Sequence, residues 1–106
     1  MKRSGERPTA VLCPDHRVAL AFVGVMRENG LGCPEDMSVT GFGRGAPEGT
    51  DPSIGITTVD HMAGRQVAEM LRLLSKQMTG DATHPEHVRV PVELMVRGST
   101  GPAPAK

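Results

Sequence analysis

Aromatic side chains are almost missing from this chain of 106 residues, which has two Phe and no Trp or Tyr. A hydrophobic core must therefore be built from Val, Leu, Ile, Met and Ala. Stacking on nucleobases or sugar rings is nearly excluded within the chain, because only Phe22 and Phe42 could supply it.

An excess of charge of either sign is also lacking, since twelve basic residues balance twelve acidic ones. A domain that grips phosphate backbones is usually basic, so the composition argues against direct nucleic-acid binding. Two cysteines, Cys13 and Cys33, are too few for a disulfide framework and fit a reducing cytoplasm. No apolar run approaches the roughly 18 residues of a membrane span, and the charged start carries no apolar region of signal-peptide type. We therefore expect a cytoplasmic protein without membrane contact.

The first half of the chain predicts a strand, a helix and a second strand. A short apolar run, Thr9 to Cys13, is typical of a strand buried on both faces. Asp15 is a suitable N-cap for a helix from His16 to Asn29, and Gly30 can end that helix in the left-handed conformation. A second strand follows from Met37 to Phe42. These lengths indicate a βαβ unit with parallel strands.

The second half begins with a Gly- and Pro-rich loop, residues 43–55, and a β-branched stretch, residues 56–59. Asp60 can then cap a helix over residues 61–79. A closing strand, His87 to Arg97, alternates apolar and non-apolar residues, and Pro91 within it predicts an edge position or a bulge. The fold class predicted is α/β, with a short, mostly parallel sheet and flanking helices.

Five segments of this layout, in this order, resemble the C-terminal part of LacI/GalR-type transcriptional regulators. They are Pro8-Thr9-Ala10-Val11-Leu12-Cys13, Arg27-Glu28-Asn29-Gly30, Pro34-Glu35-Asp36-Met37-Ser38-Val39-Thr40-Gly41-Phe42, Ile56-Thr57-Thr58-Val59 and Val90-Pro91-Val92-Glu93-Leu94-Met95-Val96-Arg97-Gly98-Ser99-Thr100.

The resemblance implies a periplasmic-binding-protein-like sensor domain, in which two lobes close on a small-molecule effector. It implies a homodimer that reaches DNA only through an N-terminal helix-turn-helix absent from this chain, with no cofactor. Such a domain is more than twice as long as this chain. We therefore expect a disordered segment or linker over residues 1–7, the C-terminal part of the effector-binding sensor domain over residues 8–98 and a flexible tail over residues 99–106.

The resemblance also suggests effector-binding residues, and the chain departs from the family at two of these places. Asp15-His16 stands where the family usually has Asn-Asp, and Gly43-Arg44 follows Phe42 where an effector-binding Asp is usual. The candidate effector contacts are Asp15, His16, Phe42 and Arg44. Arg44 could favour an anionic effector over a sugar. Each has a plainer alternative: a helix cap for Asp15, exposed positions for His16 and Arg44, and a core position for Phe42.

Other motifs give weak signals. Cys13-x-x-His16 and His84-x-x-His87 do not match paired zinc patterns, so no metal site is predicted. No helix follows the glycines at 41, 43 and 45, so a phosphate loop is not predicted either. We find no nucleophile elbow and no paired catalytic acids, and we expect a protein that is not an enzyme.

The helix over residues 61–79 raises a further expectation. Val67, Leu71, Leu74 and Met78 lie on one stripe, and in the family this region belongs to the other lobe. We therefore expect the helix either to repack on the chain's own sheet or to drive self-association. Two alternatives to the regulator remain open, a fragment of a periplasmic sugar-binding protein and a truncated interaction module.

Overall fold

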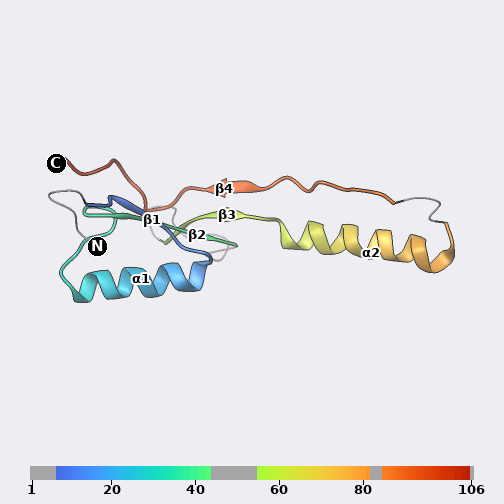
Figure 1. Ribbon diagram of the computed structural model, residues 1–106, viewed down its shortest axis with the longest axis horizontal. Coiled ribbons are helices and arrows are strands. Elements are labelled where there is room, and N and C mark those ends of the chain that lie inside the picture. Colours follow the sequence, from blue (N-terminus) through green and yellow to red (C-terminus); the bar gives the residue numbers. More distant parts are fainter. Residues whose placement is uncertain (1–6, 44–54, 82–84, 106) are drawn as a thin grey trace.

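The computed structural model describes residues 7–43, 55–81 and 85–105. Within these ranges the chain forms four short strands and two helices (Figure 1). In chain order they are β1 (Ala10–Leu12), α1 (His16–Glu28), β2 (Ser38–Phe42), β3 (Thr57–Asp60), α2 (Ala63–Thr79) and β4 (Glu93–Met95). The predicted α/β class is confirmed.

The four strands form one sheet in the order β1-β2-β3-β4. The first three strands are parallel, and β4 runs antiparallel to β3. Val39 of β2 lies opposite Val11, and Phe42 lies opposite Val59. The parallel βαβ unit predicted from the sequence is therefore present. Because parallel strands point the same way, β1, β2 and β3 all end at one edge of the sheet.

The core lies between α1 and one face of this sheet. Ala19, Val23 and Met26 recur at the spacing of one helix face and are all buried. They pack with Val39 of β2 and with two residues next to strands, Cys13 and Ile56. Each large aliphatic side chain buried in this way contributes on the order of 1.5–3 kcal/mol. This small cluster holds α1 against β1 and β2.

The prediction that the first strand is buried on both faces is wrong. Leu12 is 82% exposed and Ala10 is exposed as well. The reason is that β1 lies at the edge of the sheet and that α1 covers only one face. In the described part of the chain no second layer covers the other face, so the outward-facing apolar residues of β1 remain in solvent.

The second helix agrees with the predicted span to within two residues, but its predicted cap is wrong. Met62 occupies the N-cap position in a left-handed conformation, with φ of 57°. Asp60 lies two residues before the N-cap position, and its carboxylate instead accepts the Met62 N–H at 2.8 Å. At the other end Gly80, with φ of 77°, terminates the helix as a left-handed C-cap.

α2 extends away from the sheet, and residues 85–92, here named the return segment, run back beside it (Figure 1). The molecule is consequently long, with extents of 62 × 35 × 21 Å. Its radius of gyration is 19.1 Å, against about 13 Å for a compact domain of this size. Of the two outcomes expected for this helix, repacking onto the chain's own sheet is not observed, since no residue of α2 is buried.

The closing strand is shorter than predicted. Only Glu93–Met95 pairs with β3, while among the described residues no strand lies beside the return segment. The expected edge position is confirmed, because β4 ends the strand order. Pro91 lies before the paired residues and so removes no hydrogen bond from the sheet.

The segment after β4 is attached to the middle of the sheet by Ser99, which is 4% exposed. The Ser99 hydroxyl donates to the Val39 carbonyl at 2.5 Å and accepts the Thr57 N–H at 2.8 Å. The guanidinium of Arg97 adds hydrogen bonds to the Ile56 carbonyl and to Thr58 Oγ1. These contacts fasten β2 to β3 at the ends opposite the shared carboxyl edge.

Candidate functional site

The carboxyl edge of the three parallel strands is the candidate site, since ligands of open α/β sheets bind at this edge. Asp15 and His16 follow β1, Phe42 ends β2, and His61 follows β3. The backbone N–H of Gly43 donates to the Val59 carbonyl at 2.8 Å, so β2 and β3 stay joined up to their last residues. Side chains from three separate parts of the sequence are thereby held at one edge.

Gly41 sets how closely α1 approaches this edge. A Cβ at position 41 would lie 3.1 Å from His16 Cα and 3.2 Å from the Asp15 carbonyl oxygen. These distances are tighter than ordinary contact, so glycine allows the first turn of α1 to rest directly on β2. This close approach places Asp15 and His16 against the carboxyl end of β2.

Asp15 has a defined structural role. Its backbone is extended, with φ of −153°, and its Oδ1 accepts the Val18 N–H at 2.8 Å, so it is the N-cap of α1. The predicted cap is confirmed. Asp15 is exposed, and a carboxylate has further acceptor positions for a ligand donor. A ligand role for Asp15, and for the half-buried His16 beside it, remains a prediction.

Phe42 and His61 form a second part of the site. Phe42 is 44% exposed, and its ring centroid lies 5.3 Å from that of His61 at an interplanar angle of 55°. His61 Nδ1 is buried and has no hydrogen-bond partner among the residues that the structure describes. The backbone of His61 is fixed by Gln66, whose side-chain amide donates to the His61 carbonyl at 2.6 Å. A buried ring nitrogen without a partner is unusual, and this makes His61 a candidate for contact with a polar ligand group.

The two parts lie on opposite faces of β2. Gly41 faces α1, and successive residues of a strand point to opposite faces, so Phe42 points away from α1. The structure therefore brings Asp15 and His16 together on one side of the edge and Phe42 and His61 on the other. A ligand can reach both parts only by lying across the end of β2. Arg44, the fourth predicted residue, lies outside the described residues.

His61 belongs to no motif that singles it out in the sequence. Only its position could have identified it as a site residue. His61 closely follows the β-branched stretch 56–59, and a parallel sheet would place the end of that stretch beside Phe42. The neighbouring Asp60, which the sequence predicts as a helix cap, instead accepts the Met62 N–H.

Cys13 lies next to the site, but its thiol is expected to be unreactive. Burial, reinforced by the negative charge of Asp15, raises the pKa of its thiol. A neutral thiol is a poor metal ligand and nucleophile. Among the described residues, no group of three or more His, Cys, Asp and Glu side chains is arranged to hold a metal ion. His84, from the other weak motif, lies outside these residues.

Within the described ranges, neither helix has the length and apolar character needed to cross a membrane.

Comparison with known proteins gives the family. Residues 1–100 match the model of the periplasmic binding protein-like domain. The arabinose metabolism transcriptional repressor of Geobacillus stearothermophilus is 36% identical over 98 residues, which cover 90% of this chain and 26% of the repressor. The transcriptional regulator MalR of Streptomyces coelicolor is 38% identical over 104 residues, covering 96% of this chain and 29% of MalR. The solved structure of the transcriptional regulator CelR with cellobiose superposes with a TM-score of 0.75 at 33% identity, over 86% of this chain and 28% of CelR.

The chain belongs to the periplasmic binding protein-like domain family, and the relatives it matches are LacI-type transcriptional regulators. The resemblance predicted from the five sequence segments is thereby confirmed. The chain spans less than a third of the length of these relatives.

Proposed function

We propose that this chain is the effector-sensing and dimerising portion of a bacterial LacI/GalR-type regulator, which modulates operator binding by a DNA-binding head outside the chain. The observation that carries the proposal is the convergence of Asp15, His16, Phe42 and His61 at the carboxyl edge of the family's sheet. This edge is where an α/β sheet offers polar groups to a ligand. A regulator that binds DNA acts in the cytoplasm.

The chemistry of the edge favours a sugar-like effector. The Asp15 carboxylate can accept hydrogen bonds from hydroxyl groups. His61 Nδ1 can donate or accept one further hydrogen bond, depending on its tautomer. The partly exposed ring of Phe42 offers an apolar surface against the carbons of a sugar. The names of the relatives agree with this class, since they include an arabinose metabolism repressor and a complex with cellobiose. An anionic effector, held by Arg44, is the alternative.

The proposed mechanism is a population shift between two lobe orientations. An effector that binds one orientation more tightly raises its population and changes the spacing of the DNA-binding heads across the dimer. The first turn of α1 could pass the effect of effector binding to the rest of the helix. Asp15 is both a candidate ligand contact and the N-cap of this turn.

The test uses the complete regulator that contains this chain and a DNA fragment from upstream of its gene. Operator affinity is measured by gel shift without sugar and with arabinose, cellobiose or maltose. We expect at least one sugar to change the affinity by tenfold or more, within the roughly 5–150-fold range of allosteric coupling. Absence of any retarded fragment under all conditions would refute the proposal.

A further inference from the structure

His61 lies in the joint where the chain passes from the sheet to α2. Asp60 is the last residue of β3, and α2 begins at Ala63. Between them the backbone enters the left-handed region, since Met62 has φ of 57°. This conformation is unfavourable for a residue with a Cβ, so it persists only where neighbouring groups hold it. The place of the His61 side chain therefore depends on what holds the peptide between residues 61 and 62.

Two side chains hold this peptide group, one at each of its polar atoms. Its N–H, which belongs to Met62, donates to Asp60 Oδ1 at 2.8 Å. Its carbonyl oxygen, which belongs to His61, accepts a hydrogen bond from Gln66 Nε2 at 2.6 Å. Both hydrogen bonds are partly buried, so water competes with them less than it would at an exposed turn. Together they fix the two backbone torsions on either side of the peptide.

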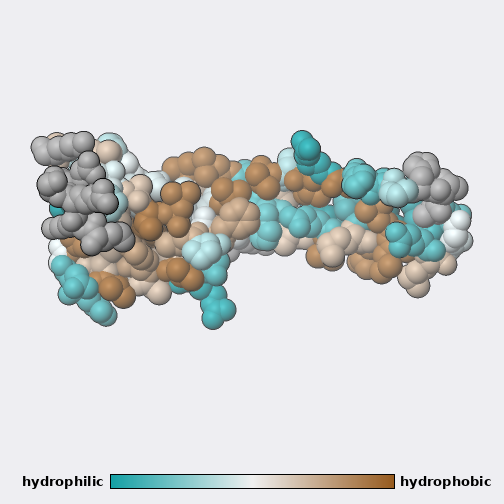
Figure 2. All heavy atoms as spheres, in the orientation of Figure 1, coloured by the Kyte–Doolittle hydropathy of each residue, from teal (hydrophilic) through white to brown (hydrophobic). Residues whose placement is uncertain are grey.

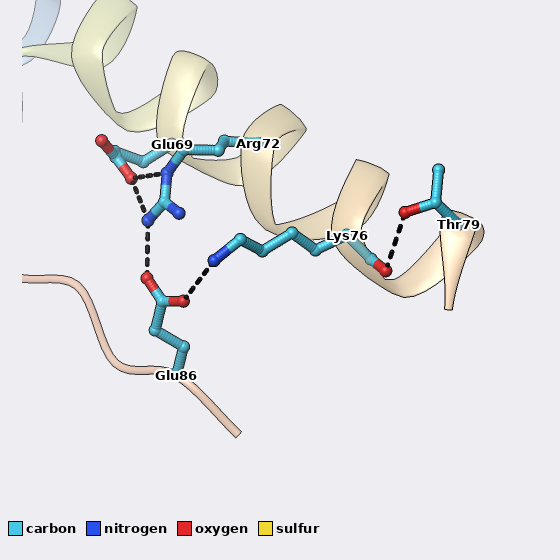
Figure 3. Close-up of polar contacts among 5 residues, drawn as sticks. All are labelled: Glu69, Arg72, Lys76, Thr79 and Glu86. Carbon is cyan, nitrogen blue, oxygen red and sulfur yellow. Dashed lines mark hydrogen bonds and ion pairs between the residues drawn. The ribbon is translucent and has the colours of Figure 1, made fainter. Parts of the chain in front are cut away.

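Gln66 acts from a helix that polar contacts attach to the return segment (Figure 3). Glu86 of the return segment pairs with Arg72 at 2.6 Å and with Lys76 at 3.2 Å. Hydrophobic side chains lie along the opposite margin of α2, away from the return segment (Figure 2), and no residue of the helix is buried. Within the described residues, hydrogen bonds and ion pairs rather than a core therefore locate α2, and Gln66 with it.

The held peptide determines where the His61 side chain starts, and hence where its ring lies. The ring centroid is 5.3 Å from that of Phe42, and the ring Nδ1 is buried without a partner among the described residues. A ligand-binding group has to be held to within about 0.5 Å and about 10–20° of its working geometry. Release of the peptide would let Met62 leave the left-handed region and would widen the range of positions open to the His61 ring.

We propose that Asp60 and Gln66 are positioning residues for effector binding at His61. They hold the peptide between residues 61 and 62, and through it the ring that faces Phe42. Their effect on binding passes through the backbone, so neither side chain has to touch the effector. This inference rests on the proposed function, in which His61 contacts the effector.

The first test is calorimetric titration of the complete regulator with whichever of arabinose, cellobiose and maltose alters its operator affinity. Asp60→Ala and Gln66→Ala should each weaken sugar binding by about threefold or more, because residues in one hydrogen-bond network are energetically coupled. Asp60→Asn should bind as the parent does, since it keeps an oxygen for the Met62 N–H and removes a negative charge opposite Glu93. Parent affinity in both alanine variants, or an Asp60→Asn variant as weak as Asp60→Ala, would overturn the proposal.

Asp36→Ala is the matched control for Asp60→Ala. Asp36 also accepts a backbone N–H, that of Gly32 at 2.6 Å, but it lies in the turn before β2, at the end of the strands opposite the carboxyl edge. Its loss should lower stability and leave sugar affinity unchanged. If Asp36→Ala weakened sugar binding as much as Asp60→Ala, a general loss of stability would account for both, and the proposal would be wrong.

A double variant separates positioning from a merely structural role. In a His61→Ala background, Asp60→Ala should change sugar affinity by less than about twofold, because no ring remains to be positioned. A full additional loss would overturn the proposal, since Asp60 would then act independently of His61. Parent affinity in His61→Ala alone would instead refute the effector contact of the proposed function. A loss in His61→Ala without any loss in Asp60→Ala and Gln66→Ala would refute this inference alone.

A third measurement needs no ligand. In the complete regulator labelled with ¹³C at its histidine rings, the His61 resonance is identified by its disappearance in His61→Ala, and the ring current of Phe42 displaces it. At constant pH, Asp60→Ala and Gln66→Ala should move this resonance toward the position of an exposed histidine, whereas Asp60→Asn should leave it in place. A resonance that moves in neither alanine variant would overturn the proposal, whichever sugar the regulator binds.

Discussion

The Cα of His16 lies 3.1 Å from the place that a Cβ on Gly41 would occupy. This contact joins the first turn of α1 to the end of β2, and with it one half of the candidate site to the sheet. The absence of a side chain at position 41 is therefore as important to the site as the side chains around it.

Gly41→Ala should lower the free energy of unfolding by about 1–3 kcal/mol, because the added methyl group must push α1 away from β2. Urea denaturation of the folded chain measures the change. Gly24→Ala is the control, since nothing lies within 4 Å of its position on α1. That variant should be neutral or more stable by up to about 1 kcal/mol, as expected for alanine in a helix. Equal effects at the two positions would contradict the close contact.

Ser99→Ala should be more destabilising than its small change in volume suggests. The substitution leaves the buried Thr57 N–H without its acceptor and removes a donor from the Val39 carbonyl. The expected loss is about 1–3 kcal/mol in the free energy of unfolding. Ser75→Ala, on the exposed side of α2, should change it by less than about 0.5 kcal/mol. A Ser99→Ala variant as stable as the parent would show that this segment does not fasten β2 to β3.

Asp15 caps α1 and is proposed to bind the effector, and two substitutions distinguish these two roles. Asp15→Ala removes the cap of α1 and should cost about 0.5–2 kcal/mol in stability. Asp15→Asn keeps an oxygen for the Val18 N–H and should preserve stability, because Asn and Asp are equally good N-caps. If the carboxylate also binds the effector, Asp15→Asn will lower effector affinity at unchanged stability. Equal effector affinity in Asp15→Asn and the parent would show that effector binding does not need the carboxylate charge of Asp15.

The two thiols should resist alkylation in the folded chain. Burial raises the pKa of both Cys13 and Cys33, so the folded chain holds fewer thiolates than the unfolded chain above pH 8. The folded state then binds more protons, and its stability should fall as the pH rises through the ordinary pKa of a thiol. Iodoacetamide labelling at pH 8.5, followed by mass spectrometry with and without urea, measures the protection. Equal labelling rates with and without urea would contradict it.

Local sequence patterns predicted the local parts of the fold well. The helix spans follow from 3.6-residue periodicity and from glycines at the C-termini, and the parallel unit follows from the lengths of its elements. The burial of β1 was mispredicted because a continuous apolar run does not show whether a second layer exists to cover Leu12. The length of β4 was mispredicted because alternation at Val90 and Val92 does not show whether a partner strand lies alongside.

The site was harder to predict for a related reason. Asp15 and His16 were identified because they directly follow a strand, whereas His61 becomes prominent only when the register places it against Phe42. The split of the site between two faces of β2 depends on Gly41 facing α1, which is a tertiary contact. Arg44 stays a prediction.

The central claim is that an effector binds across the carboxyl edge of the sheet, and calorimetric titration of the complete regulator tests it most directly. The sugar that alters operator affinity is titrated into the parent protein, His61→Ala and the control Gln77→Ala on α2. We expect His61→Ala to weaken sugar binding at least tenfold, since the loss of one hydrogen bond to a ligand is worth on the order of 1.4 kcal/mol. Gln77→Ala should bind as the parent does. Unchanged sugar affinity in His61→Ala would contradict the account.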